Sequence, residues 1–403
     1  MTKPLVNSLV FLSCEILSKA MPFLLLPYLT RVLSVDDFGR LGLFTSLQAL
    51  MIIFINISFD GAVARYYYRY GKRNFSNLIF HSFLFSALLA FFMFAIVCLF
   101  FNGDSLLLYA VVIAYLQTLF NVICTSKQCQ KKVFQYALYQ LGFSFLSVIL
   151  TVILFNLAGF DVFTRIEAIG VAFIVCALVF FLFNIGSIKN ILSLKLLKAN
   201  LFYMLSFGGP LIIHQGSLYL KGQFDRILIS HSFSLSQLAT YTAAFQVASI
   251  ANVFIMALNK ALVPYYFEAC KNQKITFNKL RKWFFICIPL VLIPGAILLL
   301  VPGSFYAFIL GQEYNDIPFL VALFVIGFGL QVPYLLIVNH LFYLNQTKKI
   351  AYATFFSGVV HLILLFMLRR YSIELLPLAM ISSNFFCLVM LFFLGMKRNE
   401  KNQ

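Results

Sequence analysis

Charged side chains are scarce in this chain of 403 residues, in which Asp, Glu, Lys and Arg together make up only 11%. A soluble domain is typically about a quarter charged and about half apolar. Here 62% of the residues are apolar, and the mean hydropathy is +0.94. A water-soluble domain cannot bury so much apolar surface, so the lipid bilayer is the expected solvent. The same composition excludes disordered, collagen-like and disulfide-rich secreted classes.

The motifs of several common chemistries are also missing. The sequence contains no G-x-x-x-x-G-K-[ST] phosphate loop and no H-E-x-x-H zinc motif. Its eight cysteines include no C-x-x-C pair, and no Cys/His cluster has the spacing of metal ligands. We therefore expect no ATP use, no cofactor, no metal and no disulfide framework, and we predict that the protein is not an enzyme.

Acidic residues are fewer than basic ones, with 13 Asp and Glu against 30 Lys and Arg and a net charge of +17. In a soluble protein this excess would indicate a nucleic-acid partner. Here most of the bases lie between apolar runs, which is the pattern that the positive-inside rule describes for membrane proteins. We therefore expect membrane lipids as neighbours and no nucleic acid.

The apolar runs predict an all-α polytopic membrane protein, because each run is about as long as one membrane-spanning helix of roughly 20 residues. Connecting segments on one side hold 21 bases and those on the other side hold six, which predicts that both termini are cytoplasmic. The twelve predicted spans are 5–29, 41–60, 78–101, 105–125, 134–157, 167–187, 202–224, 238–260, 283–303, 317–341, 350–368 and 374–395.

The two halves of the sequence resemble each other. The run Ala62–Tyr68 aligns with Ala261–Phe267 at an offset of 199 residues, and both runs follow the second span of their half. Because six spans per half is an even number, both halves would enter the membrane in the same orientation, with a site between them. We predict an N-terminal six-helix bundle over 1–190 and a C-terminal one over 191–403. Chance similarity of basic loops is the alternative.

Ionisable residues inside the predicted spans are the candidates for function. A charge at bilayer depth costs roughly 2.5–3.5 kcal/mol on insertion scales, so it should face a water-filled cavity or a partner. Lys19 and Lys221 lie in the first span of each half, and we predict that both line a cationic cavity. The other candidates in or beside the spans are Glu15, Arg31, Asp60, His214, Asp225, Arg226 and His361.

Structural alternatives exist for several of these residues. Glu15 and Lys19 are four residues apart on one helix face, so they could simply neutralise each other. Asp225 and Arg226 could pair at the outer end of their span. An isolated His361 within an apolar run is also compatible with a satisfied histidine in the helix packing.

Three segments together resemble a known family. They are Pro27–Leu33 followed by Asp37–Phe44, then Phe59–Tyr67, and Asp225–Ser230 followed by Leu238–Tyr241. The first resembles the first-loop signature of the polysaccharide-biosynthesis flippases, the Wzx-type O-antigen transporters of the multidrug/oligosaccharidyl-lipid/polysaccharide (MOP) exporter superfamily. The second and third resemble the end of span two and the connection between spans seven and eight in that family.

The resemblance implies a V-shaped pair of six-helix bundles, related by a pseudo-twofold axis, that works by alternating access. It implies transport of an O-antigen repeat unit on undecaprenyl pyrophosphate from the cytoplasmic to the periplasmic leaflet of a bacterial inner membrane, a step of lipopolysaccharide biosynthesis. The expected partners are this lipid-linked oligosaccharide and the polysaccharide polymerase and ligase proteins.

Under this interpretation the candidate residues take distinct roles. A cavity for an anionic pyrophosphate and a sugar needs bases and hydrogen-bonding side chains, and Gln117 and Asn121 in span four are candidates for the sugar. Arg31 and Arg226 end the first span of each half and would act at the outer mouth. The residues predicted for ion coupling or ion pairing are Glu15, Asp60, Asp225 and His361.

Other functions are compatible with parts of the sequence. A drug or cation antiporter of the same superfamily should prefer an acidic cavity, whereas the spans here hold more bases than acids. A flippase for the peptidoglycan precursor would usually carry extra spans. A membrane-embedded glycosyltransferase or ligase would need a long outer loop with acidic residues, and no predicted outer loop is long enough.

Overall fold

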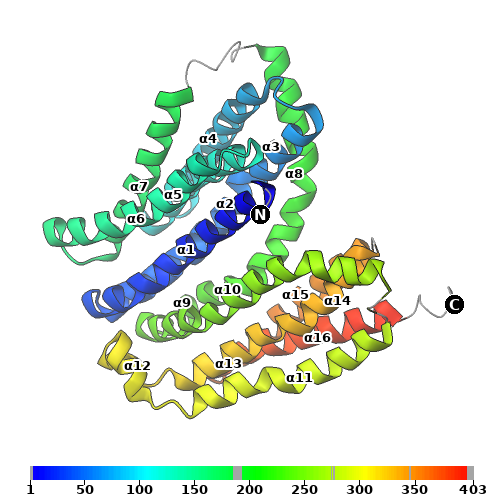
Figure 1. Ribbon diagram of the computed structural model, residues 1–403. Coiled ribbons are helices and arrows are strands. Elements are labelled where there is room, and N and C mark those ends of the chain that lie inside the picture. Colours follow the sequence, from blue (N-terminus) through cyan, green and yellow to red (C-terminus); the bar gives the residue numbers. More distant parts are fainter. Residues whose placement is uncertain (1–2, 185–192, 274, 276, 345, 397–403) are drawn as a thin grey trace. The chain divides into compact units, whose positions relative to one another are not determined.

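In the computed structural model every regular element of the described residues is a helix, and no strand occurs among them (Figure 1). The all-α prediction is therefore confirmed. The residues that the structure describes are 3–184, 193–273, 275, 277–344 and 346–396.

The helices of the first half are α1 (Lys3–Val32), α2 (Val35–Asn56), α3 (Phe59–Tyr70), α4 (Phe75–Phe100), α5 (Ser105–Cys129), α6 (Val133–Ala158) and α7 (Val162–Asn184). Those that follow are α8 (Leu194–Gly222), α9 (Phe224–Ser232), α10 (Leu235–Lys271), α11 (Phe277–Leu299), α12 (Gly303–Leu310), α13 (Pro318–Gly329), α14 (Gln331–Tyr343), α15 (Thr347–Leu368) and α16 (Pro377–Met396). Two 3-10 turns are η2 (Gln312–Tyr314) and η3 (Ile373–Leu375).

Eleven helical segments of the described chain are long and apolar enough to cross a membrane. Each overlaps one of the predicted spans from the second to the twelfth, and the 30-residue α1 overlaps the first. One of the eleven, Pro318–Tyr343, combines α13 and α14, which are separated at Leu330. Many of the largest apolar side chains are exposed, among them Phe183 at 81% and Leu300 at 83%, as expected for helices that face lipid.

The second span of each half begins with the same kind of N-cap. The side chain of Ser34 accepts a hydrogen bond from the backbone N–H of Asp37 at 3.1 Å and starts α2. The side chain of Ser234 accepts one from Gln237 at 3.2 Å and starts α10, and the Gln237 side chain reciprocates in a capping box. The two caps are 200 residues apart, which supports the internal repeat.

A break between α2 and α3 corrects the predicted end of the second span. Ile57 and Ser58 both have positive φ angles, 43° and 54°, which non-glycine residues rarely adopt. Gly208 of α8 packs against this break, and a Cβ atom there would lie only 1.8 Å from the carbonyl oxygen of Ile57. Asp60 therefore lies in the first turn of α3 and does not end the second span as predicted.

The chain divides into two compact units. The N-terminal unit holds the residues up to Leu25 and Val32–Tyr219, and the C-terminal unit holds Leu26–Arg31 and the residues from Leu220 on. The division therefore falls inside α1 and α8, the first helices of the two halves. The predicted boundary at residues 190 and 191 lies outside the described residues.

The helix α8 is joined to the N-terminal unit at several points. The side chain of Asn200 lies 2.7 Å from Nδ1 of His81 on α4, and the hydroxyl of Tyr219 lies 3.3 Å from that of Ser46 on α2. All four side chains are buried. In the same unit the rings of Phe143 and Phe173 stack at a centroid distance of 4.1 Å.

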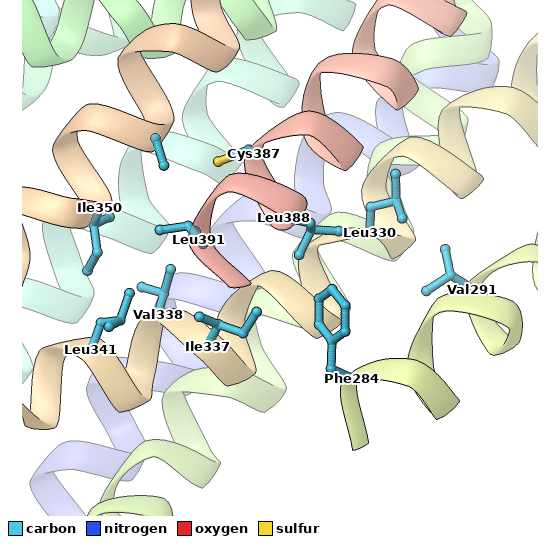
Figure 2. Packing of buried hydrophobic residues seen from close by; sticks show 11 residues of the cluster. Phe284, Val291, Leu330, Ile337, Val338, Leu341, Ile350, Cys387, Leu388 and Leu391 are labelled. Carbon is cyan, nitrogen blue, oxygen red and sulfur yellow. The ribbon is translucent and has the colours of Figure 1, made fainter. Parts of the chain in front are cut away.

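The C-terminal unit has a buried hydrophobic cluster formed by α11, α14, α15, α16 and Leu330 (Figure 2). The ring of Phe284 on α11 stacks on Phe392 of α16 at a centroid distance of 4.8 Å. Since lipid tails are as apolar as these side chains, close van der Waals packing is what holds such helices together. The cluster consists of Phe284, Val291, Leu330, Ile337, Val338, Leu341, Ile350, Ala353, Cys387, Leu388 and Leu391.

Candidate functional site

Four of the predicted site residues meet inside the C-terminal unit, and we call them the buried ionic cluster: Lys221, Asp225, Arg226 and His361. Lys221 lies in the last turn of α8, closer to a helix end than the predicted span had placed it. Asp225 and Arg226 lie on the separate short helix α9 and do not continue span seven as predicted. His361 lies in the middle of α15.

Lys221 begins a chain of polar contacts across three helices. Its Nζ atom donates a hydrogen bond to Oγ of Ser357 on α15 at 2.8 Å. Oγ of Ser357 donates to the carbonyl oxygen of Ser383 on α16 at 2.6 Å, and Oγ of Ser383 lies 3.4 Å from Nδ1 of His361. Both serines are fully buried, so these contacts replace the water that the polar groups have lost.

Asp225 and Arg226 form a buried ion pair, with 3.6 Å between Oδ1 and Nη1. Both residues are at most 5% exposed. The other carboxylate oxygen of Asp225 accepts a hydrogen bond from the hydroxyl of Tyr241 on α10 at 2.5 Å. Buried ions are costly unless they are paired and hydrogen-bonded, and this carboxylate satisfies both conditions.

The Arg226 guanidinium has further contacts within the unit. Its Nη1 atom donates to the carbonyl oxygen of Gly222 at 3.2 Å and to Oε1 of Gln223 at 2.7 Å. Its Cζ atom lies 4.2 Å from the centre of the Phe245 ring, in a cation–π contact. The geometry matches the structural alternative for Arg226, in which its neighbour Asp225 holds it. A role at the outer mouth stays a prediction.

His361 completes the cluster and is 2% exposed. The hydrogen bonds of Ser357 and Ser383 connect its imidazole ring to Lys221. With two strong bases, one carboxylate and one imidazole, the buried ionic cluster is cationic on balance. It could neutralise part of an anionic group or relay a proton between His361 and its neighbours.

The N-terminal unit holds its charges differently. Nζ of Lys19 lies 2.9 Å from Oε1 of Glu15 on the same face of α1, so the predicted i,i+4 pair forms. The side chains are 54% and 29% exposed, respectively. His214, on α8, is also exposed.

The neutral polar candidates of this unit pair with other side chains. Gln48 Nε2 donates to Oε1 of Gln117 at 2.7 Å, which links α2 to α5. Asn121 is half-buried one turn further along α5. Asp60 accepts a hydrogen bond from Asn56 Nδ2 at 2.9 Å, across the break between α2 and α3.

Arg31 lies in the short stretch of α1 that belongs to the C-terminal unit. Its side chain is exposed and donates a hydrogen bond to the carbonyl oxygen of Phe308 on α12. Arg31 could instead have paired with Asp36 or Asp37, which follow it in the sequence. Asp37 lies instead 3.7 Å from Arg40 and accepts a hydrogen bond from Ser34.

Several polar side chains of the structure escaped the sequence analysis. Tyr241, Ser357 and Ser383 form hydrogen bonds or close contacts with the buried ionic cluster, but neutral hydroxyls within apolar runs give no signal of their own. Arg165, one of the six bases predicted on the outer side, is buried and donates to the carbonyl oxygen of Ser147 on α6 at 3.2 Å. Its place at the start of an apolar run was the available signal.

Solved structures with the same fold define the class of this protein. A multidrug-resistance transporter of the MATE family and the MOP superfamily, in an inward-facing conformation, is similar with a TM-score of 0.71, at 18% identity and with 95% of each chain covered. A MOP-superfamily transporter from Pyrococcus furiosus, described as having a binding pocket of reverse polarity, is similar with a TM-score of 0.60, at 16% identity over 98% of this chain and 94% of that chain. The protein is therefore a multi-pass membrane protein with the MOP transporter fold.

The sequence comparisons then show the family. The profile of the family described as polysaccharide biosynthesis protein matches residues 5–270, and the chain belongs to this family. A protein of the Lsg locus of Haemophilus influenzae is 33% identical over 393 residues, which cover 97% of this chain and 98% of that protein. An uncharacterized membrane protein of the same organism is 34% identical, with 88% of each chain covered.

Proposed function

We propose that the protein is a flippase that moves an oligosaccharide linked to undecaprenyl pyrophosphate from the cytoplasmic to the periplasmic leaflet of a bacterial inner membrane. The observation that carries this proposal is the family match over residues 5–270, on a chain with a MOP transporter fold. In this proposal both termini are cytoplasmic, the protein performs no chemical reaction, and polysaccharide polymerase and ligase proteins receive what it exports.

The charge of the spans supports an anionic substrate. The buried ionic cluster holds Lys221 and Arg226 against the single carboxylate of Asp225. Bases that accompany the head group would offset the cost of moving a pyrophosphate through an apolar medium. Alternating access through a cationic cavity is the mechanism that we propose.

The membrane potential would then drive transport. A pyrophosphate-linked lipid carries about two negative charges, and moving each one outward is downhill by about 2.3 kcal/mol per 100 mV, or about 4–5 kcal/mol in all. Proton exchange through Glu15, Asp60, Asp225 or His361 would be secondary in this mechanism.

The test uses proteoliposomes that contain the full-length protein and a short-chain polyprenyl diphosphate sugar. A potassium diffusion potential is imposed at equal pH on both sides, and the sugar that reaches the opposite leaflet is measured with a membrane-impermeant lectin. Protein-free liposomes and liposomes with the potential reversed are the controls. Transport that follows the potential supports the proposal, whereas transport that ignores it and follows a pH gradient contradicts the driving force. No transport under either gradient contradicts the flippase function.

The fold of the multidrug transporters favours one second candidate, a cation antiporter. Such a protein should bind lipophilic cations, for which a cluster with excess basic charge is unfavourable. Uptake of a fluorescent cation into the same proteoliposomes distinguishes the two functions. Uptake driven by a proton gradient, without transport of the diphosphate sugar, would favour the antiporter.

A further inference from the structure

A surface of the N-terminal unit combines arginines with tyrosine rings. It lies where the short helix α3 packs beside α8, on the side that the positive-inside rule assigns to the cytoplasm (Figure 1). None of its residues was among the predicted site residues. We call it the basic–aromatic patch, and it consists of Arg65, Tyr66, Arg69 and Tyr70 of α3 with Tyr203 and Phe207 of α8.

The aromatic rings of α8 hold Arg65 in place. Its Cζ atom lies 5.4 Å from the ring centre of Phe207 and 6.0 Å from that of Tyr203. The Arg65 side chain is nevertheless exposed, as is that of Arg69. Within the described part of the chain neither guanidinium forms an ion pair. The patch therefore presents arginine donors that the rings orient and that no carboxylate neutralises.

Three tyrosine rings form a continuous wall beside these donors. The ring centres of Tyr66 and Tyr70 are 5.0 Å apart, and Tyr203 lies 5.5 Å from the first and 6.1 Å from the second. The Tyr66 hydroxyl donates to the carbonyl oxygen of Arg73 at 3.1 Å, which fixes the turn after α3. The phenol of Tyr66 is protonated at neutral pH, and burial raises its pKa further.

The equivalent segment of the second half lacks this combination. In the repeat alignment Pro264 stands at the position of Arg65, so Ala261–Phe267 carries no cation. The hydroxyl of Tyr266, which aligns with Tyr67, donates to the carbonyl oxygen of Leu336 at 3.1 Å and so joins α10 to α14. The repeated fold can thus be built without arginines here, and those of α3 call for another explanation.

We infer that the basic–aromatic patch binds the diphosphate-sugar head group of the lipid-linked substrate before it is moved, an inference that rests on the proposed function. Planar guanidinium groups match phosphate oxygens with paired hydrogen bonds. Tyrosine rings offer a flat apolar face with a polar edge, which suits the mixed surface of a sugar. Flexible lysines would suffice for attraction to anionic phospholipids, whereas here both cations are arginines and Arg65 is stacked on rings.

The experiment measures the affinity of the full-length protein in nanodiscs for a short-chain polyprenyl diphosphate carrying one sugar. We expect Arg65→Gln to weaken binding about tenfold, because a charge-assisted hydrogen bond to phosphate is lost. Arg65→Lys should also weaken binding, because an ammonium group cannot replace the planar fork. Tyr203→Leu should weaken binding by removing the ring that orients Arg65. The matched control is Lys271→Gln, which removes one exposed base after the aligned segment of α10 and should leave the affinity unchanged.

The outcomes separate the patch from other anion binding and from the proposed function. Equal weakening by Arg65→Gln and Lys271→Gln, or full affinity in Arg65→Lys, overturns the inference. The inference is also overturned if phosphatidylglycerol displaces a labelled polyprenyl diphosphate sugar as effectively as the unlabelled diphosphate sugar displaces it. If the wild-type protein transports the substrate and Arg65→Gln binds it normally, the inference about the basic–aromatic patch is overturned and the proposed function stands. No binding and no transport by the wild-type protein overturns both. Melting temperatures of all variants show that each one is folded.

Discussion

The first helix of each half carries a lysine, Lys19 or Lys221, within a predicted span. The structure places the two side chains in different surroundings. Lys19 on α1 is about half exposed and pairs with Glu15 one turn before it. Lys221 on α8 donates to Ser357, which lies 136 residues further along the chain. Lys19 thus pairs within its own helix, whereas Lys221 is joined to another helix through a tertiary contact.

This difference shows that the two copies of an internal repeat can share the same helices and still differ in the polar contacts of their side chains. The caps at Ser34 and Ser234 are equivalent in both halves because every span needs a start. Among the described residues the buried ionic cluster lies in the C-terminal unit, where it depends on the hydroxyls of Tyr241, Ser357 and Ser383 on α10, α15 and α16. We therefore expect substitutions to have unequal effects in the two halves.

The largest loss of stability is expected for Asp225→Asn. It removes the carboxylate that pairs with Arg226 and leaves a buried guanidinium uncompensated, so the free energy of unfolding should fall by about 3–5 kcal/mol. Denaturant unfolding of the purified protein in detergent measures this, with Asp36→Asn on the exposed start of α2 as the control. A loss no larger than that of the control would show that the pair is not needed.

A smaller loss is expected for Tyr241→Phe. The ring keeps its place, but Asp225 loses the hydrogen bond from the hydroxyl, which should cost about 1.5–3 kcal/mol because the acceptor is charged. In a double-mutant cycle with Asp225→Asn, the double mutant should lose less free energy of unfolding than the sum of the two single losses. Full additivity would contradict the contact.

Accessibility should separate the two lysines directly. On a cysteine-free background, a cysteine at position 19 should react with a water-soluble cationic thiol reagent more rapidly than a cysteine at position 221. The physical reason is that the side chain of Lys19 is 54% exposed and, being charged, should face water rather than lipid, whereas that of Lys221 is held against α15. Denatured protein provides the control for intrinsic reactivity. The opposite order, or complete protection at position 19, would contradict the comparison.

The smallest effect is expected for Glu15→Gln. Exposed i,i+4 ion pairs contribute about 0.3–0.5 kcal/mol, and salt screens them. Unfolding at low and high salt should show a loss of this size that shrinks as salt is added. A loss comparable to that of Asp225→Asn would mean that the Glu15–Lys19 pair is as shielded from water as the Asp225–Arg226 pair.

The predictability of the fold follows from the physics of the bilayer. Apolar runs of span length must become helices in lipid, so every predicted span meets a helix. The break between α2 and α3 was missed because nothing local marks it. Ile57 and Ser58 are ordinary residues of a span, and the break at this point packs against Gly208, more than a hundred residues away. Leu330, which separates α13 from α14, differs in this respect, because Gly329 and Pro333 beside it are local signals of a helix break.

The sequence by itself determined the solvent and the spans, because these depend on composition and on the length of the apolar runs. It also determined the contact between Glu15 and Lys19, since residues four apart on a helix are neighbours. Only the tertiary structure decided that Lys221, Asp225, Arg226 and His361 share one buried cluster, and that rings of α8 hold Arg65. Contacts between distant helices depend on how those helices rotate and pack against one another, which no local pattern specifies.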